Sequence, residues 1–223
     1  TLKKGAWWQR FGDSTLDALE AQALAANPTL AAASGRLAQA RSQVAAAESG
    51  LLPSLGFAGR AARFKISQDR PLTNYQSPNF STVQNDFAAA MTTSYELDLA
   101  GRVRRTVEGA RASAEQSAAD LENTRLLLSA ELATDYYAMR ELDIELDVVT
   151  RAVALQRRSL ELATARHDLG ATSGLDVASQ QALLDSTLTQ IDVLHRQRSQ
   201  FEHAIATLTG TAAPPFSLAA DIR

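Results

Sequence analysis

The chain has no cysteine among its 223 residues, which excludes disulfides, cysteine-ligated zinc and thiol catalysis. Aromatic residues make up only 6%, so we expect no thick core of bulky rings. No run of 18 apolar residues occurs, and the sequence therefore offers no candidate transmembrane helix. A transmembrane β-barrel is compatible with these absences, because its strands are short and apolar only at alternate positions.

An excess of charge of one sign is also missing. The 22 basic residues nearly balance the 25 acidic ones, and this balance argues against a nucleic-acid partner. The three histidines lie at positions 167, 195 and 203, without the close spacing that zinc ligands on one helix need. No catalytic triad, phosphate-binding loop or paired-carboxylate pocket is recognisable. We therefore expect no enzyme activity, no metal and no cofactor.

Alanine is abundant instead, with 42 residues, and its small side chain favours helices that approach each other closely. A capping-box pattern at Ser14–Asp17 predicts a short helix that begins with Ser14 as its cap and runs to about Ala26. Asn27 is then expected to cap a second helix over 28–49, with Pro28 at its first position.

A different pattern follows over residues 53–98. Residues 86–99 alternate between two faces, which predicts a long strand. A partner strand is expected at 54–66, with a bulge near 59–62 and a polar loop at 67–84. One face of the 86–99 strand carries Phe87, Ala89, Met91, Thr93, Tyr95, Leu97 and Leu99, and the other carries Asp86, Ala88, Ala90, Thr92, Ser94, Glu96 and Asp98.

The longest predicted element is a helix over 103–169, in which a stripe of positions in alternating steps of four and three lasts more than eight heptads. Such a helix is about 100 Å long at about 1.5 Å per residue. Gly170 ends it, and a capping box from Ser173 to Asp176 begins a return helix over 174–209. His167 falls on the heptad stripe and is expected to form a polar layer there.

Five segments, in this order, are typical of one protein family. They are Trp7–Asp13 (WWQRFGD), Ala25–Pro28 (AANP), Leu52–Leu55 (LPSL), Tyr95–Arg104 (YELDLAGRVR) and Ala165–Val177 (ARHDLGATSGLDV). In these segments the sequence resembles the outer-membrane efflux proteins of the TolC/OprM type, and specifically the first of that family's two repeats.

The resemblance implies a mainly α fold, in which a very long coiled-coil helical hairpin carries an inserted long β-hairpin. It implies a homotrimer with a 12-stranded transmembrane β-barrel in the outer membrane of a Gram-negative bacterium, continued by a helical tunnel in the periplasm. The channel would be the passive exit duct of a tripartite efflux pump for drugs or other small solutes. Its partners would be a periplasmic adaptor protein, an inner-membrane pump and outer-membrane lipid.

Two departures from the family pattern are expected to matter. The sequence stops after one repeat, and the lipidated cysteine of many OprM-type members is absent. We therefore interpret the chain as one repeat of a longer protein, whose gate the resemblance places largely in the second repeat. Its segments would be the first tunnel helices at 1–52, the barrel hairpin at 53–100, the tunnel hairpin at 101–210 and a linker at 211–223.

Three sets of site residues follow from this interpretation. The adaptor-docking tip would comprise Leu169, Gly170, Ala171, Thr172, Ser173 and Asp176. The lumen-facing positions would be Asp86, Thr92, Ser94, Glu96 and Asp98, and the lipid-facing positions Phe87, Met91, Tyr95 and Leu97. The alternative is a periplasmic coiled-coil interaction protein with a soluble β-hairpin, in which the tip is only a capped turn.

Overall fold

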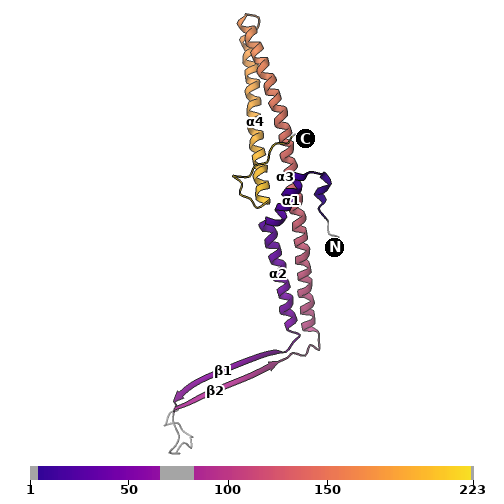
Figure 1. Ribbon diagram of the computed structural model, residues 1–223, viewed down its shortest axis with the longest axis vertical. Coiled ribbons are helices and arrows are strands. Elements are labelled where there is room, and N and C mark those ends of the chain that lie inside the picture. Colours follow the sequence, from indigo (N-terminus) through magenta and orange to yellow (C-terminus); the bar gives the residue numbers. More distant parts are fainter. Residues whose placement is uncertain (1–4, 66–82, 222–223) are drawn as a thin grey trace, which may run out of the picture. The chain divides into compact units, whose positions relative to one another are not determined.

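The protein consists of helices with one inserted pair of strands, in the predicted order (Figure 1). The structure is a computed structural model and describes residues 5–65 and 83–221, so most of the predicted loop at 67–84 lies outside the described residues. Within those ranges, no helix combines the length and the apolar character that a membrane crossing requires. The elements are a 3-10 helix at Trp7–Phe11, α1 (Ser14–Ala26), α2 (Pro28–Ser49), β1 (Ser54–Lys65), β2 (Val83–Ser94), α3 (Arg102–Asp168) and α4 (Gly174–Leu208).

Contacts divide the chain into two compact units. The core unit comprises Thr1–Leu37 and Ser117–Arg223, and the strand unit comprises Ala38–Gln116. Helices α2 and α3 each contribute residues to both units.

The core unit is built on the predicted heptad stripe of α3. Apolar residues of α1 and α4 pack against this stripe in two clusters, and α2 packs against Leu121 in a third. The buried stripe positions of this unit are Leu121, Leu128, Leu132, Met139, Leu142, Leu146, Val149 and Val153. The stripe is therefore confirmed through most of α3, but His167 is exposed rather than packed in a polar layer.

The cap of α1 differs from the prediction. Asp13, not Ser14, is the N-cap, because its Oδ1 accepts hydrogen bonds from the backbone N–H of Thr15 (2.8 Å) and Leu16 (3.1 Å). Ser14 is already in the helix. The Asp13 carboxylate also accepts a hydrogen bond from the Tyr136 hydroxyl of α3 at 2.6 Å. One side chain thus both starts α1 and attaches it to α3.

The predicted cap of α2 is confirmed. Asn27 Oδ1 accepts from the N–H groups of Thr29 and Leu30, and Asn27 Nδ2 also donates to the carbonyl of Leu208 at the end of α4 (2.9 Å). Gly210 follows in the left-handed conformation, at φ +69°, and a Cβ there would lie 2.8 Å from the carbonyl oxygen of Ala26. This close approach requires glycine.

The two strands of the strand unit form one antiparallel hairpin. Its register runs without interruption from Ser54 opposite Ser94 to Lys65 opposite Val83, so the predicted bulge near 59–62 is absent. The predicted strand end at 99 is also wrong. In this register the residue opposite Tyr95 would be Pro53, which has no N–H to donate, and the pairing ends one step before it.

Candidate functional site

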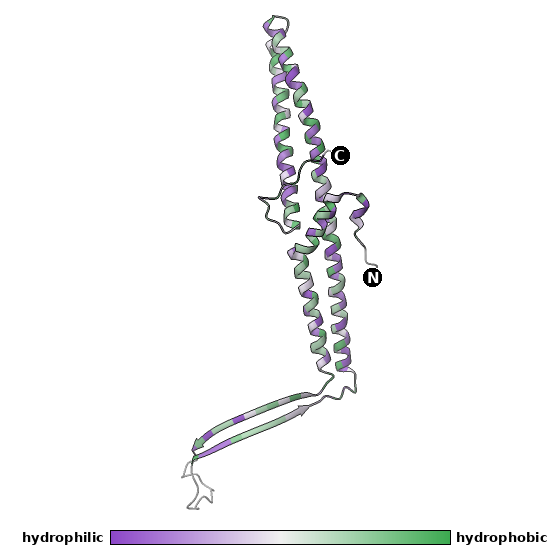
Figure 2. Cartoon of the chain, in the orientation of Figure 1, coloured by the Kyte–Doolittle hydropathy of each residue, from purple (hydrophilic) through white to green (hydrophobic). Residues whose placement is uncertain are grey.

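The two faces of the β1–β2 hairpin have different chemistry. Large apolar side chains share one face, where Leu55, Phe57, Phe87 and Met91 are 71–80% exposed. The opposite face carries the polar residues Arg60, Asp86, Thr92 and Ser94 among small residues, with Phe64 and Gln84 at the loop end of the strands. Figure 2 shows hydrophobic residues along most of both strands and hydrophilic residues toward their loop ends. The predicted lipid-facing and lumen-facing residues within β2 therefore fall on opposite faces.

The polar face is internally bonded. Arg60 forms an ion pair with Asp86 of the neighbouring strand. The Ser54 hydroxyl donates to the carbonyl of Ser94 at 3.2 Å. A Cβ at Gly56 would lie 2.7 Å from the Thr92 hydroxyl oxygen, so Gly56 leaves room for this threonine. These contacts rigidify the face on which we expected the water-filled lumen.

The junction between β2 and α3 holds residues 95–99, which we expected within the strand, and four of them belong to the predicted site sets. Tyr95 and Leu97 lie beyond the end of β2 and are exposed. Glu96 forms an ion pair with Arg102, in the first turn of α3. The structure thus removes these residues, together with Asp98, from the predicted strand faces.

Asp98 caps α3 instead of lining a strand face. Its Oδ1 accepts from the N–H of Val103 (3.2 Å), and its Oδ2 accepts from the N–H of Arg104 (2.9 Å). The hydrogen bond from the Arg104 N–H, with help from those of Val103 and the Arg104 side chain, lowers the pKa of Asp98 despite the opposing effect of desolvation. A carboxylate at the start of a helix also interacts favourably with the helix dipole.

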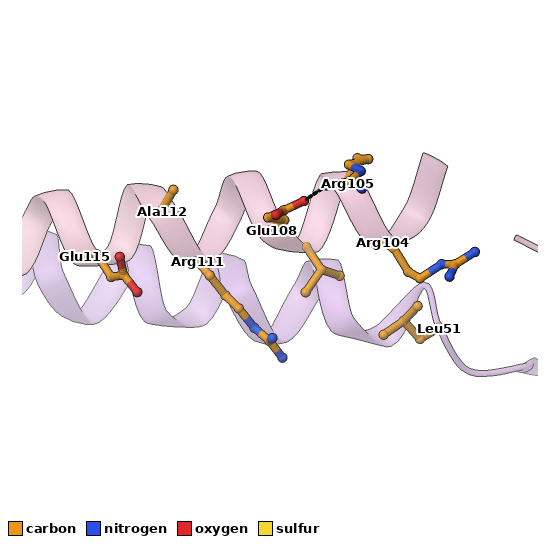
Figure 3. A pocket seen from close by; sticks show the side chains of 8 residues that line it. Leu51, Arg104, Arg105, Glu108, Arg111, Ala112 and Glu115 are labelled. Carbon is orange, nitrogen blue, oxygen red and sulfur yellow. Dashed lines mark hydrogen bonds and ion pairs between the residues drawn. The ribbon is translucent and has the colours of Figure 1, made fainter. Parts of the chain in front are cut away.

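A surface pocket of about 540 Å³ lies beside this junction, within the strand unit (Figure 3). Most of its charged groups pair with neighbours: Arg105 with Glu108, as Figure 3 shows, Arg111 with Glu48 of α2, and Arg104 with Asp98. Since most of these charges are neutralised and the lining carries both signs, the pocket does not single out an anionic or a cationic ligand. In the described residues, no three metal-ligating side chains converge either.

The tip between α3 and α4 ends one helix and starts the next. Gly170 is left-handed, at φ +74°. The N–H of Gly170 donates to the carbonyl of His167, and the N–H of Ala171 donates to that of Arg166, each at 2.8 Å. This pair of bonds is a Schellman motif, and it confirms Gly170 as the end of the helix.

Ser173 and Asp176 form the predicted capping box at the start of α4. Sequence reasoning missed a further contact, in which His167 Nδ1 lies 2.9 Å from the carbonyl oxygen of Thr172. The exposed His167 therefore joins the end of α3 to the turn. Ala171 is exposed as expected, but Thr172 is half-buried, and its hydroxyl has no hydrogen-bond partner.

A buried charge network in the core unit was also missed. The side chain of Asp143 on α3 is 1% exposed. It forms ion pairs with Arg140 at 2.9 Å and with Arg198 of α4 at 2.6 Å. Arg198 in turn pairs with Glu202 at 3.3 Å. In the sequence these residues lie on helix surfaces that looked solvated. Only the pairing of α3 with α4 brings them together.

This network holds the segment after α4. Arg198 donates to the carbonyl of Leu218 at 2.7 Å, and the N–H of Leu218 donates to Glu202 at 2.6 Å. Phe216 and Leu218 also pack against the apolar core. Residues 211–221, which we expected to be a linker, are therefore fixed onto the helices of their own unit.

Glu20 of α1 is completely buried in the same unit. Neither carboxyl oxygen has a partner at hydrogen-bonding distance and geometry. Burial raises the pKa of Glu20 to about 7, with a smaller contribution of the same sign from Asp17 and an opposing one from the nearby Ser129 hydroxyl. The only sequence signal for this buried acid is its place on the apolar side of a short helix.

Comparisons with known proteins agree with this architecture. The model of the outer membrane efflux protein family matches residues 19–211. The pyoverdine export outer membrane protein OpmQ of Pseudomonas aeruginosa is 28% identical over 204 residues, which cover 92% of this chain and 43% of OpmQ. The toluene efflux pump outer membrane protein TtgF of Pseudomonas putida is 26% identical over 208 residues, which cover 93% of this chain and 42% of TtgF.

Among solved structures, the outer-membrane channel OprN aligns with a TM-score of 0.82 and 28% identity, covering 99% of this chain and 48% of OprN. The chain thus spans less than half the length of these relatives. The predicted resemblance, the mainly helical fold with its inserted hairpin, and the outer-membrane location are confirmed by these comparisons. The chain belongs to the outer membrane efflux protein family.

Proposed function

We propose that this chain supplies part of the wall of an outer-membrane efflux channel, through which solutes leave the cell passively. The observation that carries the proposal is the exposed apolar face of the hairpin, with Leu55, Phe57, Phe87 and Met91 together on it. Leaving one such side chain in water instead of burying it costs about 1.5–3 kcal/mol. A covering of lipid on this face and water on the opposite, polar face satisfies both sets of side chains.

We infer that the chain carries out no covalent chemistry. Efflux through a wide tube needs polar inner walls and a driving force from elsewhere, and it needs no reacting group. The alternative, a periplasmic coiled-coil protein with a soluble hairpin, would have to cover the same apolar face with another protein.

Cysteine labelling distinguishes the two functions, because the chain has no native cysteine. We expect Phe87→Cys to react with a lipid-phase maleimide and not with a membrane-impermeant one. Thr92→Cys on the other face is the matched control and should show the reverse. Reaction of Phe87→Cys with the impermeant reagent alone would exclude the channel.

The proposed channel needs more strands than this chain has. Two strands leave two open edges and do not close a barrel. We propose a homotrimer in which further strands complete a 12-stranded wall, while α2, α3 and α4 contribute to a periplasmic tunnel. The 223-residue chain alone should therefore show a strongly helical circular dichroism spectrum but no single-channel current in lipid bilayers. Robust currents from the chain alone would contradict the proposal that further strands are needed to close the barrel.

The tip is the proposed docking site for a periplasmic adaptor, and through it for an inner-membrane pump. Its exposed residues, Leu169 and Ala171, stand at a rigid turn between two helices. We expect Ala171→Glu to abolish efflux without lowering stability, since the side chain is exposed. Drug susceptibility and protein level should be measured together. Unchanged efflux at normal protein level would show that the tip is only a turn and does not dock an adaptor.

A further inference from the structure

The apolar face of the hairpin ends in two basic residues. Arg63 and Lys65 follow Ala61 on the same face of β1, and both are exposed. The residues opposite them on β2 are Asn85 and Val83, so neither cation meets an acid across the strands. Within the part of the chain that the structure describes, neither cation has an ion pair or a hydrogen bond.

Arg60 on the other face behaves differently. It is only three residues away, and it pairs with Asp86. Among the described residues, the hairpin therefore pairs the cation on its polar face with an acid and gives the two cations on its apolar face no such partner. An apolar surface that ends in unpaired cations is complementary to a lipid with an anionic head group.

Strand geometry gives the depth of these cations. Arg63 and Lys65 are eight and ten residues beyond Leu55, or about 26 and 33 Å along the strand at about 3.3 Å per residue. With the usual tilt of about 40°, they lie about 20–25 Å above Leu55, at the upper boundary of an apolar band about 25 Å tall. This end of the hairpin is the one farther along the chain from α2 and α3, the proposed periplasmic helices. Its boundary is then the outer leaflet.

We propose that Arg63 and Lys65 bind the phosphate groups of lipid A, the phosphorylated lipid of the outer leaflet. This inference rests on the proposed function, because it requires the apolar face to contact lipid. The planar guanidinium of Arg63 can hold two phosphate oxygens at once, and the ammonium of Lys65 adds a second charge two residues along. Phe57 and Phe87, on the same face, lie lower along the strands, where the acyl chains of that lipid would run.

The test is lipid binding to the detergent-solubilised channel, measured by native mass spectrometry. The probes are diphosphoryl lipid A, fully dephosphorylated lipid A and phosphatidylglycerol. We expect the double variant R63S/K65S to bind diphosphoryl lipid A about 25-fold more weakly than the wild type, the factor expected for two cations at an anionic lipid surface. The charge-conserving R63K/K65R should bind within threefold of the wild type. Arg60→Ser removes one cation from the other face and should leave this affinity unchanged.

Several outcomes would overturn the inference. These are wild-type affinity in R63S/K65S, equally tight binding of dephosphorylated lipid A, or equally tight binding of phosphatidylglycerol. If the double variant does not reach the membrane, the single variants decide the matter, each with an expected loss of about fivefold. Labelling of Phe87→Cys separates this failure from failure of the channel itself. Lipid-phase labelling with unchanged lipid A affinity rejects only the inference, whereas water-phase labelling rejects the channel.

Discussion

The core unit and the strand unit use charge in opposite ways. In the core unit, Asp143 is 1% exposed and joins two arginines that are 12–14% exposed. In the strand unit, the pair Arg105–Glu108 is 80% and 65% exposed.

Apolar residues differ in degree. The core unit buries Leu128 and Leu132 between helices, although it exposes Leu155. The described strands of the hairpin expose both Phe57 and Phe87 and bury no large apolar side chain. The core unit thus has buried clusters of its own, and the described part of the hairpin in the strand unit has none.

The largest expected effect comes from breaking the buried network. Asp143→Ala leaves two cations without their shared partner, and removing one member of a buried ion pair costs about 3–5 kcal/mol. We expect this loss in the free energy of unfolding, measured by urea titration with circular dichroism. Hydrogen exchange at the Leu218 amide should rise with it. Asp147→Ala, which removes a more exposed partner of Arg151, is the control and should cost under about 1 kcal/mol.

Glu20 gives the next largest effect, and it depends on pH. The folded-state pKa of about 7 lies above the ordinary value of 4.5, so the folded chain keeps a proton that the unfolded chain has lost. The resulting loss of stability begins as the pH rises past 4.5 and is complete above 7. Glu20→Gln should therefore stabilise the chain by about 2 kcal/mol at pH 8, after allowance for screening, and by little at pH 4. Thermal unfolding of the variant and the wild type at both pH values measures this difference in stability. The exposed Glu145→Gln should show no such difference, and an equal gain at both pH values would contradict the burial of an ionising acid.

The tip gives a smaller effect. Ser173→Ala removes one half of the capping box at the start of α4 and should cost about 1 kcal/mol. Hydrogen exchange at the Asp176 amide localises the loss to the first turn of that helix. His167→Ala is an informative companion, because it removes only the contact with the Thr172 carbonyl. Unchanged exchange in Ser173→Ala would mean that the Schellman motif and the His167 contact hold the turn without the capping box.

The smallest expected effect is in the strand unit. Arg105→Ala breaks an exposed ion pair between residues three apart on α3, and we expect a change within about 0.5 kcal/mol. Urea titration of this variant, run beside Asp143→Ala, tests the comparison between the units directly. A loss above about 2 kcal/mol would show that the exposed pairs also stabilise the fold.

Much of the fold could be predicted from local pattern. The heptad stripe of α3, Gly170 at its end, Asn27 as a cap and the two faces of the hairpin all depend on residues close in the sequence. The errors in the α1 cap and in the end of β2 also concern residues close in the sequence. Ser14 and Asp13 are both good capping residues, and the prediction of Ser14 was wrong. The polar/apolar alternation of β2 continues past Ser94, but pairing stops there because the next residue of β1 would be Pro53.

The site residues that were missed have roles that depend on contacts between segments and not on local sequence pattern. Asp98 looked like one more polar position on a strand until the turn to α3 brought its carboxylate to the N–H groups of Val103 and Arg104. Glu202 looked like a solvated acid of a helix, and its contact with Leu218 spans a turn that no local pattern describes.

The sequence by itself determined the periods: 3.5 residues for the long helices, two for the strands, and glycine or a capping residue where each helix ends. These follow from backbone sterics and the spacing of apolar side chains, which act over a few residues. Only the tertiary structure decided which charges are buried together, as at Asp143 and Arg198, which are 55 residues apart. A side chain's ionisation and hydrogen bonding depend on the neighbours that packing brings within a few ångströms, and those neighbours come from other parts of the chain.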